Sequence, residues 1–157
     1  MPRSSQMPAR ELRREGASDV AHDYEKVKLL FDYTKYHIGI YTTLGTILIG
    51  ILGLHLGIND DKSPLQFCGL FIWISIVFIA IAGMAGGIIA STLPESDSLP
   101  RFFALRTGPW GWKLLSGRAW TMVEHTAFWI GLIVGLTAFL IPELLGHTPA
   151  FCSVHIS

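Results

Sequence analysis

Apolar and polar positions alternate in long blocks along this chain, and some apolar blocks are about as long as a bilayer is thick. The run from Tyr36 to Ile58 contains no Asp, Glu, Lys or Arg. At about 1.5 Å per residue it covers the roughly 30 Å hydrocarbon core of a membrane. The run from Leu65 to Ala90 is also uncharged and precedes Pro94, which disfavours helix continuation. We therefore predict transmembrane helices over residues 36–58 and 65–91.

A third apolar run, Ala127 to Ile141, is shorter. It crosses a bilayer only if the helix begins near Thr121 and continues past Pro142 to Leu145. We therefore predict a third transmembrane helix over 121–145. The connector between the first two runs is so short that they must form an antiparallel hairpin.

The segment ahead of the first span has an apolar position at every third or fourth residue, with charged residues between them. This spacing predicts an amphipathic helix over residues 18–35 that runs into the span. Such a helix lies on the membrane, projects into the cytoplasm or packs beneath the bundle, and the pattern leaves these three open. Residues 1–17 are small, polar and charged, so we expect a disordered tail there. The apolar positions are Val20, Tyr24, Val27 and Phe31.

The connector over residues 92–120 mixes basic and aromatic side chains. Indole and guanidinium groups both find partners in the headgroup layer of a membrane. We predict an interfacial connector with one or two short helices, broken around Thr107-Gly108-Pro109. The expected interfacial anchors are Trp110, Trp112, Trp120, Arg101, Arg106 and Arg118.

Composition and charge placement extend this picture. Half of the residues are hydrophobic and 15% are charged, which indicates an all-α integral membrane protein. Eleven of the twelve Lys and Arg residues lie in the first 35 residues or in the connector 92–120. Because positive charge favours the cytoplasmic side, we expect a cytoplasmic N-terminus and a non-cytoplasmic tail over 146–157.

The same charges bear on location and partners. We expect a bacterial inner membrane with a periplasmic C-terminus, and a mitochondrial inner membrane is the alternative because Arg and Ser precede Glu11. The net charge is zero and acidic residues interrupt the basic tail, so we expect no nucleic-acid partner.

Glycines recur at helix-packing spacing, with one GxxxG pair in each predicted span. Lipid supplies no hydrophobic drive between helices, so spans associate where small residues let backbones approach. Spacing does not decide whether these faces pack within one copy or between copies. The helix-packing candidates are Gly50, Gly53, Gly57, Gly83, Gly86, Gly87, Gly131 and Gly135.

Three polar residues are expected at similar depth near the cytoplasmic ends of two spans. His37 lies in the first span and Glu124 and His125 in the third. If these helices touch, the histidines bracket a haem iron, or Glu124 relays a proton with a histidine. A solvated or mutually hydrogen-bonded set explains the same residues, and we favour it. We expect no cofactor, with haem as the alternative.

Both cysteines are predicted on the non-cytoplasmic side. A periplasm allows a disulfide between Cys68 and Cys152, and two free thiols are the alternative. Acidic and histidine residues gather on the same side, but their spacings match no zinc pattern, so we expect no metal site. These residues are His55, Asp60, Asp61, Glu143, His147 and His155.

Enzyme signatures such as GxSxG, a P-loop, a GxGxxG after a strand or CxxC are absent, so we expect no catalytic residues. The leading hypothesis is a non-enzymatic inner-membrane subunit that oligomerises or anchors a membrane-protein partner. One alternative is an oligomeric pore or transport accessory lined by Thr43 and Thr46. Another is a haem-binding electron-transfer anchor that uses His37 and His125.

Overall fold

Three long helices dominate the computed structural model, which describes residues 9–57, 67–146, 149 and 152, with α1 side chains from His22 to Leu54. Each is long and apolar enough to cross a membrane. The prediction of a mostly helical chain with three such helices is confirmed, and it is compatible with a multi-pass membrane protein. The helices are α1 (Ala9–Gly57), α2 (Gly69–Thr92) and α4 (Gly117–Leu145).

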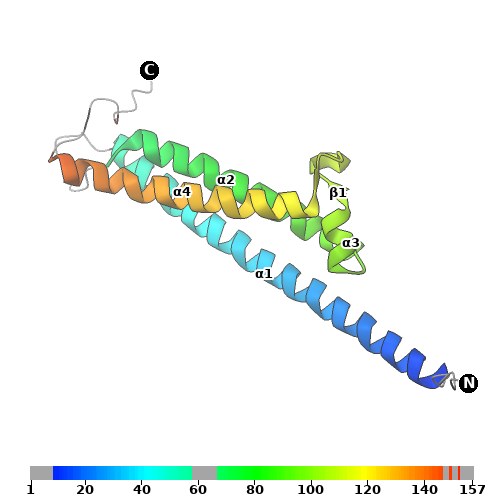
Figure 1. Cartoon of the computed structure of the whole chain (residues 1–157). Helices are drawn as coiled ribbons and strands as arrows, with labels where there is room; N and C mark the ends of the chain where they lie inside the picture. The colour runs from blue at the N-terminus through cyan, green and yellow to red at the C-terminus, as the bar shows by residue number, and fades with distance from the viewer. Residues whose placement is uncertain (1–8, 58–66, 147–148, 150–151, 153–157) are drawn as a thin grey trace, which may run out of the picture.

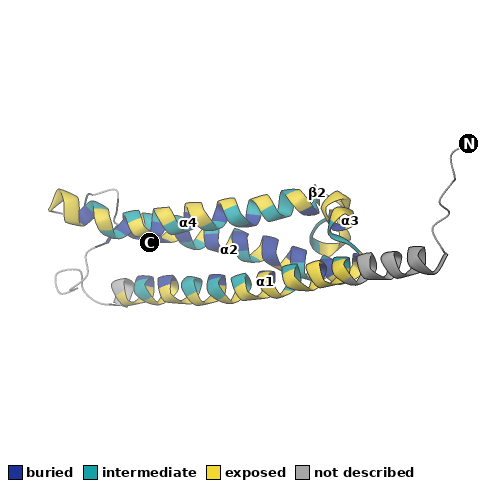
Figure 2. Ribbon diagram, turned by 60° about the horizontal axis from the view of Figure 1, so that its bottom comes forward, coloured by how far each residue is buried: buried dark blue, intermediate teal, exposed yellow. Residues whose placement is uncertain are grey.

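The three helices form an elongated bundle. In Figure 1, α2 and α4 run side by side, and α1 lies along them before its N-terminal part extends past α3. The middle helix α2 packs against both other long helices. Figure 2 shows buried positions along α2 and exposed positions on the outer faces of α1 and α4. α2 is therefore the centre of the bundle.

The N-terminal helix begins earlier than composition suggests. We expected disorder over residues 1–17, but α1 starts at Ala9, and residues 1–8 lie outside the described residues. The segment from Ala9 to Glu15 consists of Ala, Arg, Glu and Leu, which are among the strongest helix formers. The composition of this segment is therefore compatible with the helix that the structure has from Ala9.

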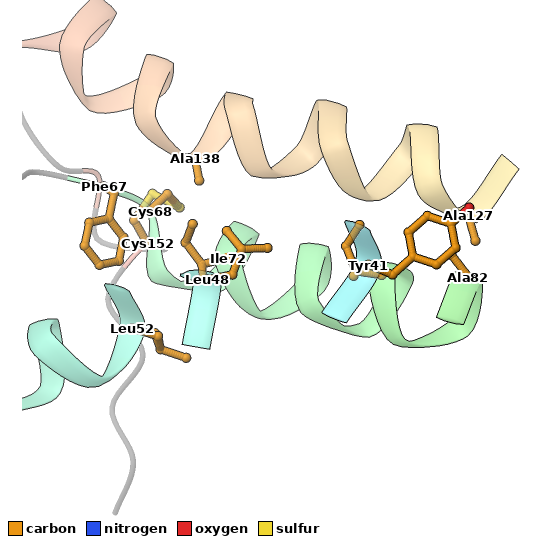
Figure 3. Packing of buried hydrophobic residues seen from close by; sticks show 11 residues of the cluster. Tyr41, Leu48, Leu52, Phe67, Cys68, Ile72, Ala82, Ala127, Ala138 and Cys152 are labelled. Atoms are coloured by element: carbon orange, nitrogen blue, oxygen red, sulfur yellow. A yellow bond between two sulfur atoms is a disulfide. The ribbon is translucent and has the colours of Figure 1, made fainter. Parts of the chain in front are cut away.

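The main core lies where the three helices meet. Figure 3 shows Tyr41 and Leu48 of α1, Ile72 of α2, and Ala127 and Ala138 of α4 turned toward one another. All five are buried. The outer surfaces carry exposed apolar side chains instead, as expected for helices that face lipid. These include Ile47, Val77, Met84, Ile133 and Leu140.

A second, smaller core ties α1 to the connector. Val27 is buried, and it packs with Ile89, Leu93 and Phe102. Partly buried Phe31 packs against the same cluster. This part of α1 therefore packs against the connector and the end of α2.

The connector contains a small hairpin that the sequence did not predict. Strands β1 and β2 pair antiparallel, with Arg106 opposite Ser116 and Thr107 opposite Leu115. We expected only helices here, and strands of two residues are too short to show an alternating pattern. The connector elements are η2 (Leu93–Glu95), α3 (Leu99–Ala104), β1 (Arg106–Thr107), η3 (Pro109–Gly111) and β2 (Leu115–Ser116).

A disulfide between Cys68 and Cys152 lies at the opposite end of the bundle (Figure 3). We expected Cys68 one turn inside a helix that begins at Leu65. It precedes α2 instead, in an extended conformation, because its N–H donates to the Ala138 carbonyl 2.8 Å away. α4 continues through Pro142 and ends at Leu145, where Gly146 adopts a left-handed conformation with φ 66°.

Candidate functional site

A buried carboxyl group links α1 to α4 inside the bundle. The Tyr41 hydroxyl of α1 donates to Glu124 Oε1 of α4 at 3.0 Å. Glu124 is 1% exposed and Tyr41 is 3% exposed. A buried acceptor is costly without a donor, so this bond satisfies a group that water cannot reach. The α2 backbone closes the site, because a Cβ at Gly86 would lie 3.4 Å from Glu124 Oε1.

Both candidate histidines lie next to this pair. The His37 and His125 rings are 6.2 Å apart between centroids. His37 Nδ1 is 2.9 Å from the Tyr33 carbonyl, and His125 Nδ1 is 2.9 Å from the Thr121 carbonyl. A carbonyl only accepts, so each Nδ1–H donates and each Nε2 is the acceptor in the neutral ring. The structure thus brings His37, Glu124 and His125 together, as helix depth suggested.

Tyr33 occupies the space beside the two imidazoles. Its ring centroid is 3.9 Å from that of His37, and its hydroxyl is 3.3 Å from His125 Nε2. Tyr33 therefore contacts both histidines, and the Tyr41 hydroxyl is the hydrogen-bond partner of Glu124. The haem alternative stays a prediction.

Sequence reasoning missed the two tyrosines as members of this cluster. Tyr33, His37 and Tyr41 are spaced four residues apart, which places them on one face of α1. That spacing was the available signal. Which helix they face is a tertiary property, since it depends on how α1 is rotated against α4.

Two glycines of α4 and one glycine of α2 lie at helix contacts inside the bundle. A Cβ at Gly135 would lie 2.8 Å from Ser75 Oγ, and one at Gly131 would lie 3.1 Å from Ile79 Cδ1. Ser75 also donates to the Gly131 carbonyl at 2.7 Å. A Cβ at Gly86 would lie 3.2 Å from Ile38. These positions allow close helix contact within one copy.

Other candidate glycines face outward. A Cβ at Gly50, Gly53 or Gly87 would meet nothing within 4 Å. Gly83 is intermediate, since its Cβ would lie 3.9 Å from Tyr41 Cβ. Gly57 is the last residue of α1, and its surroundings lie outside the described part of the chain. Along α1 the open glycines therefore form part of a free surface.

This surface is a stripe of small residues, which we call the outer face of α1. Its members are spaced alternately by four and three residues, so they lie on one side of the helix. All are exposed. The Thr43 and Thr46 hydroxyls donate to the carbonyls of Gly39 and Thr42 at 2.9 and 2.8 Å, so neither needs an outside partner. The outer face comprises Gly39, Thr43, Thr46, Gly50 and Gly53.

Two of the residues expected at the membrane interface donate hydrogen bonds to backbone carbonyls of the connector. The Trp120 indole N–H donates to the Thr107 carbonyl at 2.8 Å. Arg106 Nη2 donates to the Leu114 carbonyl at 3.0 Å. The Trp120 bond holds the hairpin against the start of α4, and the Arg106 bond links the two sides of the hairpin.

The remaining interfacial candidates are exposed. Trp110 and Trp112 are among the most exposed apolar side chains of the described residues, and their rings contact each other. Arg118 is exposed, and Arg101 pairs with Asp97. These side chains surround the connector end of the bundle.

Within the residues that the structure describes, no group of three or more His, Cys, Asp or Glu side chains could hold a metal ion. The side chains of His55, Asp60, Asp61, His147 and His155 lie outside that description, and Glu143 is exposed on α4. Comparison with protein-family models, curated proteins and solved structures finds no match.

Proposed function

We propose that this chain is a non-enzymatic, multi-pass membrane subunit that associates through the outer face of α1 with a second transmembrane helix, in the first instance that of another copy. The observation that carries the proposal is the contrast between the glycines. Atoms of neighbouring helices lie close to Gly86, Gly131 and Gly135 inside the bundle. In contrast, a Cβ would meet nothing within 4 Å at Gly39, Gly50 or Gly53.

Close backbone approach is how helices associate in lipid. The outer face of α1 offers this approach over four turns without any bulky side chain. Its threonine hydroxyls bond to their own helix, so no polar group has to be desolvated when a partner binds. The N-terminal part of α1, which extends past the bundle (Figure 1), supplies a second contact for an anchored partner.

The orientation belongs to the same proposal. The basic part of α1 and the connector lie at one end of the bundle, and the Cys68–Cys152 disulfide lies at the other. Positive charge favours the cytoplasmic side, and disulfides persist in oxidising compartments. This supports a bacterial inner membrane with the N-terminus in the cytoplasm and the C-terminus in the periplasm.

Self-association tests the proposal directly. Fluorescence energy transfer between labelled copies in liposomes should reveal an oligomer of the native chain. Gly50→Leu should weaken association by about tenfold or more, because the added side chain separates the backbones. The matched control is Gly87→Leu, which adds the same side chain at an open, exposed position of α2.

Association of the control should equal that of the native chain. A native chain that stays monomeric at all protein-to-lipid ratios would refute the proposal. So would equal association of Gly50→Leu and the native chain. Weaker association of Gly87→Leu alone would move the interface to α2 and reject the outer face of α1.

A further inference from the structure

A long groove runs between α1 and α4 on the side of the bundle next to the outer face of α1. Its volume is about 640 Å³. Ile40 and Ile47 of α1 form one wall, and Phe128 and Leu132 of α4 form the other. Lys35 and Tyr36 line one end, and the Thr43 hydroxyl farther along is bonded to the Gly39 carbonyl. The groove therefore has an apolar length and a basic end.

The groove continues toward the disulfide end of the bundle. A second hollow of about 160 Å³ shares Leu44, Ile47 and Leu132 with the first and extends to Ile51 and Phe139. From Lys35 to Ile47 the helix rises about 18 Å, which is close to one leaflet of a roughly 30 Å hydrocarbon core. The main groove thus matches one lipid chain in length.

The basic end of the groove favours an occupant with a negatively charged group. Lys35 is exposed, and its Nζ lies 5.3 Å from the centroid of the Phe31 ring, one turn nearer the N-terminus. The ammonium group therefore points away from the apolar walls, as a lysine does at a membrane surface. No salt bridge to Lys35 occurs in the described part of the chain. Its charge is available for an anionic headgroup.

We propose that the groove between α1 and α4 binds one acyl chain of an anionic phospholipid, with the headgroup phosphate at Lys35 and Tyr36. The lipid comes from the leaflet at the connector end of the bundle. This site borders the association surface proposed above and shares Gly39 and Thr43 with it, but its opposite wall, Phe128 and Leu132, belongs to α4.

Native mass spectrometry of the full chain in mild detergent tests the site. The probes are phosphatidylglycerol and phosphatidylcholine with identical acyl chains. The native chain should retain one phosphatidylglycerol with about fivefold preference over phosphatidylcholine. Lys35→Gln should abolish this preference. Lys28→Gln is the matched control, because Lys28 is an exposed lysine on the same side of α1 that does not line the groove.

A second variant tests the apolar part. Leu132→Trp places a larger side chain in the groove and should reduce retention of both lipids. Equal retention of the two lipids by the native chain would overturn the proposal, as would an unchanged preference in Lys35→Gln. If Leu132→Trp weakens self-association and leaves lipid retention intact, the groove is a helix interface and the lipid site is rejected. Failure of Gly50→Leu to affect association would not alter any of these outcomes.

Discussion

At the scale of single residues, the bond between Tyr41 and Glu124 is a buried polar contact between α1 and α4. The two side chains bridge helices that otherwise leave a groove between them. Glu124 cannot reach water, so its acceptor depends on this donor. The pair therefore acts as a specific contact between two helices, in a surrounding where apolar contacts alone discriminate little between rotations.

Removing the Tyr41 hydroxyl alone should lower the stability of the bundle more than removing both polar groups of the pair. We expect Tyr41→Phe to lower the free energy of unfolding by about 1–2 kcal/mol, because the buried Glu124 carboxyl loses its partner. Glu124→Gln keeps an acceptor oxygen and should cost less. The measurement is unfolding in mixed micelles, followed by circular dichroism.

The double variant Tyr41→Phe with Glu124→Leu is the control for this interpretation. It removes both polar groups and should recover part of the lost stability. If the double variant is as unstable as the sum of its single changes, the two side chains do not act as a pair, and the bond is not what holds α1 to α4.

At the scale of helices, the contact between α2 and α4 depends on two glycines that face Ser75. The Ser75 hydroxyl bonds to the Gly131 carbonyl, and Gly135 leaves the space that the hydroxyl occupies. Any side chain at position 135 displaces Ser75 or separates the helices. This contact has no equivalent on the outer face of α1.

Gly135→Val should therefore destabilise the bundle by about 1–3 kcal/mol, the usual effect of overpacking. Gly87→Val is the matched control on α2, where a Cβ meets open space. We expect its unfolding free energy to equal that of the native chain. Equal stability of the two variants in the same micelles would show that α2 and α4 do not pack through Gly135.

Local sequence signals predict where the helices lie along the chain better than they predict which side of each helix is buried. The three long helices were predictable because each contains a long apolar run, of the length that a bilayer crossing requires. The candidate site was partly predictable, since depth alone placed His37 near Glu124 and His125. Tyr33 and Tyr41 were missed because their role depends on the rotation of α1. Gly131 and Gly135 are enclosed in α4 whereas Gly50 and Gly53 are open in α1, so a glycine in a small-residue pattern does not by itself separate an internal contact from a free surface.

At the scale of the whole molecule, charge and covalent chemistry separate to opposite ends of the bundle. The connector carries Arg101, Arg106, Lys113 and Arg118 at one end, and the disulfide joins Cys68 to the tail at the other. A bilayer that the bundle crosses would keep these ends in different compartments. One side would supply the negative potential that favours basic residues, and the other would supply the oxidising conditions.

Single engineered cysteines test this arrangement without a change to the native pair. Both native cysteines form the disulfide, so an added cysteine is the free thiol of the chain. Lys113 and Glu143 are exposed at the two ends of the bundle. In intact cells a membrane-impermeant maleimide should label Glu143→Cys strongly and should label Lys113→Cys only after permeabilisation, because a crossing separates them. Equal labelling of both variants in intact cells would mean that the two ends share a compartment, and the three-span topology would then be wrong.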